Sequence, residues 1–272
     1  MKNQVYFQKR EGYRSLSVVS GISSAIKEVS LVYYEPNLVM PMHTHSVGQF
    51  STMLMGQSIE RNLKVEFDTH HGLVEFKPIA YQHCNMIGPS GAIFLSINID
   101  SEHEDFMSEY GRLEWIVSDT KLASQRWRNL LTTLLSDRAA QTVDLEERVL
   151  SLLDTSLSTK HAIKIAPQWL KLAEQAVIET QMSVTDIAQS VGVHRVHLCR
   201  VFQNHFGLSV SQFRHRAMLQ KSLVGMITNK LNISSASADS GFADQSHFTR
   251  TMKQQFGITP LKMRNLFAPR IA

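Results

Sequence analysis

This 272-residue chain lacks most features that mark secreted, membrane or nucleotide-dependent proteins. It has only two cysteines, which excludes a disulfide framework and favours a reducing compartment. It has no run of about 18 apolar residues that would predict a transmembrane helix, and residues 1–8 lack the apolar core of a signal peptide. It contains neither a P-loop nor a glycine-rich dinucleotide motif. These absences predict a cytoplasmic protein that has no membrane partner.

What the chain does contain is a duplication. His197 to Gly207 (HLCRVFQNHFG) and His247 to Gly257 (HFTRTMKQQFG) place His, Arg, Phe and Gly at matching positions. Each copy repeats apolar residues at i, i+4 and i+8 and ends at Gly, which predicts a helix with one buried face. Arg200 and Arg250 fall on the opposite, exposed face. The duplication therefore predicts two similar reading helices.

The residues before each copy predict a helix-turn-helix unit. Ser183 suits the N-cap of a short helix, Asp186 its first turn and Gly192 its end. The two units span about residues 183–206 and 233–256. Between them, residues 209–229 show helical spacing of apolar residues. Roughly 19 helical residues would span about 28 Å, close to the roughly 34 Å between successive major-groove faces of B-DNA. One chain would then reach two adjacent grooves.

Charge divides the chain in the same way. Residues 167–272 contain 12 Lys and Arg against 5 Asp and Glu, a net charge of +7, whereas residues 1–166 contain 16 against 19, a net charge of −3. Such asymmetry is expected of a phosphate-binding module joined to a domain of another function. The cationic half of the chain is the half that carries the duplication.

The segment from Gly241 to Pro260, followed by Arg264, resembles the signature of the AraC/XylS family of bacterial transcription regulators. The resemblance covers roughly residues 165–267. It implies two helix-turn-helix subdomains joined by a long helix, which bind double-stranded promoter DNA as a unit, with RNA polymerase as a partner if the protein is an activator. Where the family usually has Ile-Ala in the second unit, this chain has Ala236 and Ser237. We therefore expect a looser core and a less secure DNA contact in that unit.

Candidate DNA-contacting side chains follow from the exposed faces. Arg200 and Arg250 are the strongest candidates, because Arg donates two hydrogen bonds to a guanine edge; the alternative is that each is a solvated charge. His197 and His247 either read bases, or cap and pack. The site is expected to be a tandem pair of half-sites about one helical turn apart. The full candidate set is Val196, His197, Arg200, Gln203, Gln245, Ser246, His247, Thr249, Arg250 and Lys253.

Residues 5–100 show short apolar runs separated by Gly, Pro and Asn, which predicts a compact all-β unit. Residues 41–56 and 72–83 are similar to the two cupin motifs, which implies a small barrel with metal ligands at His43, His45 and His83. Gln49 stands where the family has Glu. His43 and His45 are expected on one side of a strand, with His83 opposite.

Three neutral imidazoles and an amide oxygen suit a divalent transition metal such as Zn, Ni, Fe or Cu. The alternative is that these residues are relics of a metal site and line a pocket for an organic effector. Cys84, beside His83, is assigned to core packing.

From residue 101 the pattern turns helical. Leu122, Trp127, Leu130, Leu131, Leu134 and Leu135 predict one amphipathic helix, and residues 143–157 predict another. Their apolar faces are expected to pack on the barrel wall and on a second subunit, because the family resemblance implies dimerisation by such helices; the alternative is that they pack only on their own barrel. Residues 159–166 are predicted as the linker, and Pro167 is expected to open the first helix beyond it.

The resulting hypothesis is an α+β multidomain protein. Residues 1–100 form a cupin-like sensing barrel, residues 101–158 a helical region for homodimerisation, and residues 167–272 the DNA-binding domain. A small-molecule or metal effector would change promoter binding, and the protein would not be an enzyme. One rival is a metal-dependent cupin enzyme with an appended DNA module, against which Gln49 counts. Another is an architectural DNA binder that takes no ligand.

Overall fold

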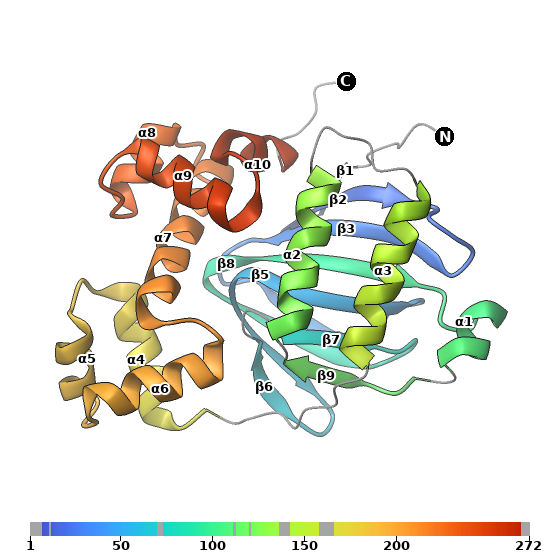
Figure 1. The fold of residues 1–272 in the computed structure, drawn as a ribbon, viewed down its shortest axis with the longest axis horizontal. Coiled ribbons are helices and arrows are strands. Elements are labelled where there is room, and N and C mark those ends of the chain that lie inside the picture. The colour runs from blue at the N-terminus through green and yellow to red at the C-terminus, as the bar shows by residue number, and fades with distance from the viewer. Residues whose placement is uncertain are drawn as a thin grey trace.

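The computed structural model describes residues 7–10, 12–69, 73–110, 113–119, 121–135, 142–157 and 166–267. A β-rich part with two covering helices is followed by an all-helical part, and the long helix α7 (Val210–Ile227) joins two groups of helices within the second part (Figure 1). The α+β fold predicted from the sequence is confirmed. Residues 159–165 of the predicted linker lie outside the described residues.

Within the described residues, nine strands form one antiparallel sheet with the path β1-β2-β3-β8-β5-β7-β9; β4 also pairs with β8, and β6 with β5. The strands are β1 (Phe7–Arg10), β2 (Tyr13–Ser20), β3 (Ile26–Tyr34), β4 (Val39–His43), β5 (Gly48–Asn62), β6 (Glu66–Thr69), β7 (Leu73–Lys77), β8 (His83–Ile99) and β9 (Ile116–Asp119). The two longest strands, β5 and β8, pair with each other; β3 and β4 also pair with β8, and β6 and β7 with β5.

A bend in β5 and β8 turns this sheet into two facing layers. The β5–β8 register shifts between Gly56 and Ser58, and both Gly56 and Gly91 have positive φ, at 116° and 66°. A Cβ on Gly56 would lie 2.4 Å from the Gly91 carbonyl oxygen, so the close approach of the two strands requires glycine there. Residues from both sides of the bend line one pocket. This is the cupin-like architecture expected of the N-terminal part.

The region after residue 100 contains α1 (Glu104–Tyr110), α2 (Lys121–Leu135) and α3 (Thr142–Leu157), and in addition the strand β9, which pairs with β7. The helical spacing did not predict that strand. Trp127, Leu131 and Leu152 are fully buried in one apolar cluster with sheet residues. These buried faces therefore pack on the chain's own sheet (Figure 1), as the alternative interpretation holds, while dimerisation through α2 and α3 stays a prediction.

The helices of the C-terminal part begin and end where the sequence places caps. They are α4 (Gln168–Glu179), α5 (Val184–Ser190), α6 (Arg195–Phe206), α7, α8 (Ile233–Asp239), α9 (Gln245–Phe256) and α10 (Pro260–Leu266). Ser183 and Asp186 form a capping box at α5, and Pro167 precedes α4 at its N-cap. Gly207 and Gly257 end α6 and α9 with φ of 68° and 72°, a conformation that favours glycine. Among the described helices, none combines the length and the apolar composition that crossing a bilayer requires.

The two helix-turn-helix units are packed differently. The first, built from α4 to α6 and the start of α7, has an apolar cluster of its own around Leu170, Leu198 and Phe202. The second, built from the rest of α7 and from α8 to α10, shares one continuous cluster with the β-sheet and with α2 and α3. Phe267, at the end of α10, lies with its ring centre 5.8 Å from that of Tyr33 on β3. The second unit is therefore joined to the N-terminal domain through a common core.

Candidate nucleic-acid interface and metal centre

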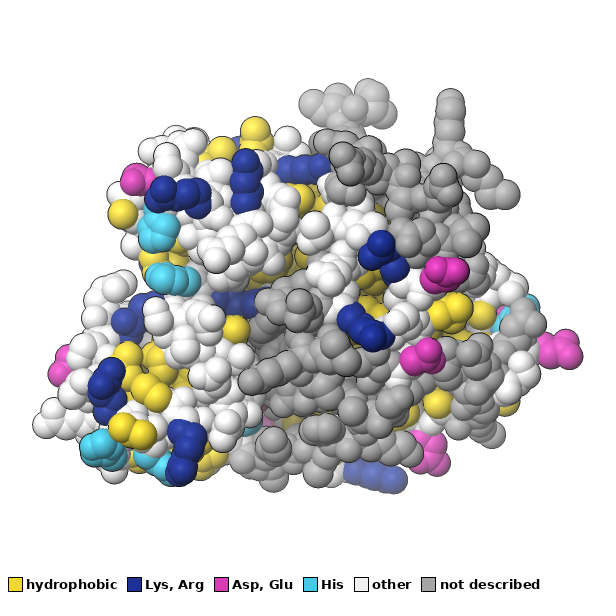
Figure 2. Space-filling view, viewed as in Figure 1, with side chains coloured by type: hydrophobic (Ala, Val, Ile, Leu, Met, Phe, Trp, Pro, Cys, Tyr) yellow, Lys and Arg dark blue, Asp and Glu magenta, His cyan; other side chains and the backbone are white. Residues whose placement is uncertain are grey.

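The reading helices α6 and α9 expose the faces that the sequence predicts. Val196 is 65% exposed, and Arg200 and Gln203 are exposed beside it on α6. On α9, the exposed members of the candidate set are Gln245, Ser246, Arg250 and Lys253, whereas Thr249 is half-buried. Lys and Arg side chains lie on the surface over both helix groups (Figure 2). The two helices thus present polar and cationic side chains at matching positions.

The two duplicated histidines pack against aromatic rings. The His197 ring centre lies 5.5 Å from that of Trp169, and its Nδ1 lies 3.3 Å from Nη2 of Arg200. The His247 ring centre lies 5.2 Å from that of Phe242. His197 is exposed and His247 is half-buried, and a base contact by either residue stays a prediction. A histidine that the sequence does not single out, His194, caps α6 by accepting a hydrogen bond at Nδ1 from the Val196 backbone N–H.

The expectation of a looser second unit with a less secure DNA contact stays a prediction. Ala236 and Ser237 are each 1% exposed and lie in the closed core beneath α9. The rest of α7 and the N-terminal domain supply the apolar neighbours that the small side chains do not. The cost is a buried Ser237 hydroxyl, which has no hydrogen-bond partner in the described structure.

Two arginines of residues 167–272 bind groups within the protein. Arg216 is 8% exposed, donates a hydrogen bond to the Leu54 carbonyl oxygen, and lies 5.6 Å from the ring centre of Phe256. Arg214 donates to the Met182 carbonyl oxygen at 2.6 Å. The net charge of residues 167–272 therefore overstates the charge available to DNA, because helical spacing alone does not show which cations turn inward.

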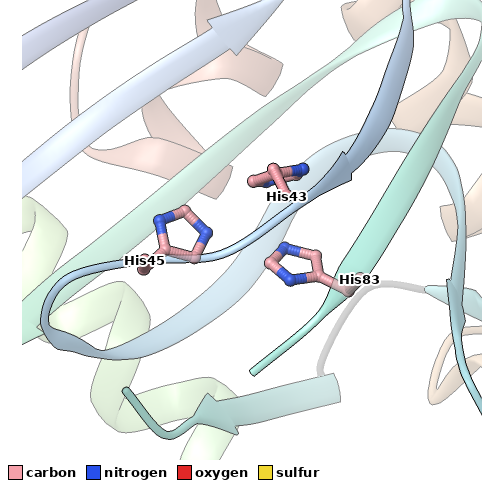
Figure 3. A group of neighbouring side chains, drawn as sticks. All are labelled: His43, His45 and His83. Carbon is pink, nitrogen blue, oxygen red and sulfur yellow. The ribbon is translucent and has the colours of Figure 1, made fainter. Parts of the chain in front are cut away.

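The structure brings His43, His45 and His83 together between the two layers of the sheet (Figure 3). One ring nitrogen from each lies within 4.8 Å of the others. His43 is the last residue of β4 and His83 the first of β8, and the two pair in register. His45, expected on the same strand as His43, instead lies in the loop after β4. The strand ends earlier than the sequence predicts, yet the loop returns His45 to the group.

Backbone hydrogen bonds orient two of these rings. Nδ1 of His43 lies 2.8 Å from the Pro41 carbonyl oxygen, and Nδ1 of His83 lies 3.3 Å from that of Tyr81. With the proton on Nδ1, Nε2 of each ring is left for a ligand. Burial, with the charge of Lys77 adding to it, lowers the pKa of His45 to about 4 and that of His83 to about 3. Both are neutral at pH 7, the form that binds metal.

The pocket around the three histidines has a volume of about 30 Å³. That is the space of one water molecule or ion, and far below what a small organic molecule requires. Gln49 lines the pocket as predicted, and its Nε2 donates to Oδ1 of Asn98 at 3.2 Å. The three imidazoles and the volume both fit a metal ion.

A buried charge network beside the histidines was missed by the sequence analysis. Nζ of Lys77 lies 2.9 Å from both Glu60 Oε2 and Glu75 Oε2, and all three side chains are buried. Asn85 donates to Glu60 at 2.9 Å, and Trp115 to Glu75 at 2.7 Å. Burial, followed by the charge of Glu60, raises the pKa of Glu75 to about 8, so one proton is shared within this group at neutral pH. Glu75 and Lys77 stand two apart within the apolar run at residues 73–77, and this spacing could have placed both side chains on one face of a strand.

The helical part matches a known family and several curated proteins. Residues 187–266 match the family model described as a helix-turn-helix domain. The arabinose operon regulatory protein of Escherichia coli is 22% identical over 200 residues, which is 72% of this chain and 64% of that protein. Residues 187–266 form a helix-turn-helix domain that is similar to the corresponding part of this regulator. This confirms the resemblance on which the sequence analysis relied.

Two further relatives of the AraC-type domain are named as regulators. The transcriptional activator NphR of Rhodococcus sp. is 27% identical over 124 residues, 45% of this chain and 37% of the relative. The Msm operon regulatory protein of Streptococcus mutans is 28% identical over 120 residues, 44% of this chain and 42% of the relative. The chain thus spans less than two thirds of the length of these relatives.

Solved structures give remote likenesses. ToxT from Vibrio cholerae is 12% identical, with 95% of this chain and 99% of that chain covered and a TM-score of 0.40. Oxalate decarboxylase from Bacillus subtilis is 16% identical, with 38% of this chain and 29% of that chain covered and a TM-score of 0.33.

Proposed function

We propose that this chain is a sequence-specific transcription regulator of the AraC/XylS type, which binds promoter DNA and responds to an effector at its N-terminal domain. One observation carries the proposal: the AraC-type domain presents two capped helices with an exposed Arg at the same position of each, Arg200 on α6 and Arg250 on α9. We propose further that the protein forms a homodimer and, if it is an activator, that it contacts RNA polymerase.

The test is the affinity of the full chain for a DNA fragment recovered from a randomised library, at one fixed salt concentration. Arg200→Ala and Arg250→Ala should each weaken binding about tenfold or more, as expected when a bidentate guanine contact is lost. Lys221→Ala removes an exposed cation of α7 and serves as the matched charge control. Unchanged affinity in both Arg variants, with melting temperatures preserved, would contradict base reading by these residues.

We propose in addition that His43, His45 and His83 hold one divalent transition ion such as Zn, Ni or Fe. The support is the mutual distance of their ring nitrogens, the orientation of the rings and the volume of the pocket. Such an ion, when bound, is a Lewis acid and tethers β4 to β8. His43, His45 and His83 would supply nitrogen ligands, and Gln49 borders them.

Metal analysis after dialysis against Zn²⁺ and then buffer should find one ion per chain, and none in His83→Ala. His103→Ala, outside this cluster, serves as the control. The same measurement separates the rival function. Stoichiometric iron or manganese together with turnover would favour a cupin enzyme with an appended DNA-binding module, and would contradict a purely regulatory role.

A further inference from the structure

A methionine borders the pocket in which the three histidine rings meet (Figure 3). Met40 lies on β4 three residues before His43, and both residues line the pocket. Residues three apart on a regular strand point to opposite faces of the sheet. The register of β4 against β8 shifts between Met40 and His43, so that three steps along β4 match the two steps from Asn85 to His83. This bulge brings the thioether and the imidazole to one side of the strand.

The local sequence MPMH, residues 40–43, explains the bulge. Pro41 has no backbone N–H to donate to a neighbouring strand, and proline within sheets is confined to edge strands and bulges. Among the described strands, β4 pairs only with β8, so it is an edge strand. Met42 is 46% exposed and does not line the pocket. The two methionines of this strand therefore differ, because Met40 borders the histidines and Met42 faces solvent.

The pocket offers uncharged ligands. Among the described residues, no carboxylate and no thiol lines it. Lys77 is the only Lys, Arg, Asp or Glu of this described lining, and its partners Glu60 and Glu75 do not border the pocket. An ammonium group repels a divalent ion more strongly than a monovalent one. A pocket with neutral ligands and a neighbouring ammonium therefore favours a singly charged ion.

We propose that the pocket binds copper as Cu(I), with His43, His45 and His83 as nitrogen ligands and the Met40 thioether as a sulfur ligand, and that copper is the effector. Thioether sulfur is a soft ligand that suits Cu(I), whereas imidazole serves zinc, nickel and copper alike. The unbranched, flexible Met side chain can adjust its sulfur to an ion that the rings hold. This inference rests on the proposed metal centre, and it narrows the ion from the divalent ions of that proposal to Cu(I).

The layer that holds these ligands also contacts the first helix-turn-helix unit. In this layer β4 pairs with β8, β8 with β5 and β5 with β6. Asp68 on β6 lies 2.6 Å from Nζ of Lys171 on α4, and Gln57 on β5 donates to Glu174 on α4 at 3.1 Å. An ion that joins β4 to β8 therefore acts on the layer against which α4 is docked.

Two variants with the same substitution test the sulfur ligand in the full chain. Met40→Leu nearly keeps the side-chain volume and removes the sulfur, and Met42→Leu does the same at the exposed methionine. Cu(I) affinity, measured by competition with bicinchoninate without oxygen, should fall at least about tenfold in Met40→Leu, because a soft ligand is lost. It should not change in Met42→Leu. Zn²⁺ affinity should stay the same in both variants, since imidazoles supply its ligands.

The contrary results separate the sulfur ligand from the metal centre. Unchanged Cu(I) affinity in Met40→Leu would overturn the sulfur ligand, and so would equal losses for Cu(I) and Zn²⁺, because a distorted pocket weakens both ions. Cu(I) binding no tighter than Zn²⁺ binding in the unmodified chain would overturn the choice of ion. In each of these cases the proposed metal centre stands. Binding of neither ion would contradict that centre as well.

X-ray absorption at the copper edge decides the matter should Met40→Leu not fold. The unmodified chain loaded with Cu(I) should show a sulfur scatterer beside those of imidazole, and Met42→Leu should show the same spectrum. A first shell of nitrogen and oxygen alone would overturn the sulfur ligand.

The effect of copper on DNA binding is measured separately. Saturating Cu(I) should change the affinity for the selected DNA fragment at least about fivefold, and this change should disappear in His83→Ala. An unchanged affinity would overturn copper as the effector while the ligand set stands. Absence of any specific DNA binding would instead contradict the proposed function, and the affinities for Cu(I) and Zn²⁺ would still decide the ligand set.

Discussion

The two helix-turn-helix units have nearly the same reading helix but are attached to the N-terminal domain in different ways. Phe256, at the end of α9, belongs to a core that runs without interruption into the sheet and into α2. Phe206, at the corresponding position of α6, belongs to a separate core and also borders a cavity. The second unit is therefore fixed to the N-terminal domain by a shared apolar core, whereas the first unit is held by polar contacts around a cavity.

The largest expected effect is the loss of stability when a side chain of the shared apolar core is truncated. Phe256→Ala and Phe202→Ala both truncate fully buried aromatic side chains, and each should lower the free energy of unfolding by about 3 to 5 kcal/mol. Only Phe256→Ala should speed hydrogen exchange in β3 and β8, because only its core includes the sheet. Equal exchange in those strands for both variants would show that the units are attached alike.

An intermediate effect is expected at the linker helix. Arg216→Met removes the hydrogen bond to the Leu54 carbonyl and leaves that oxygen buried. Hydrogen bonds that involve a charged group contribute about 1.5 to 3 kcal/mol, and chemical denaturation should detect a loss of that size. Lys221→Met, on an exposed position of the same helix, is the control. A loss below about 0.5 kcal/mol would contradict the role given to Arg216.

The smallest effect is expected where the first unit meets the sheet. Gln57→Ala removes the hydrogen bond to Glu174 and should speed hydrogen exchange in α4 by a factor that corresponds to about 0.5 to 1.5 kcal/mol. Exchange in α9 should not change. Gln175→Ala, which removes a bond within α4 itself, controls for helix stability. Faster exchange in α9 as well would contradict the separate attachment of the two units.

Local signals in the sequence predicted much of this molecule. The capping residue Ser183, the terminating Gly207 and Gly257, and the apolar spacing of α6 and α9 act within a few residues, so the helices could be inferred directly. The meeting of His43 with His83 was inferred from the cupin resemblance. In each case the determining residues lie within one element or one motif.

Contacts between distant elements could not be predicted in this way. Arg216 and Leu54 are 162 positions apart, and nothing in the helical spacing of α7 distinguishes this buried Arg from an exposed cation. Ala236 lies in an apolar cluster that includes residues of the sheet and of α2, and a comparison of the two units alone does not show these neighbours. The cavity between β5 and α4 is bordered by Gly56 and by residues of the helical domain, which are distant in the sequence.

Selection of binding sites from a randomised DNA library by the full chain shows whether α6 and α9 each read DNA. We expect a direct, non-palindromic pair of half-sites about one helical turn apart, in which Arg200→Ala relaxes the preference at one half-site only and Arg250→Ala at the other. Recovery of no common sequence, or of a site whose preferences neither variant changes, would contradict base reading by these two helices.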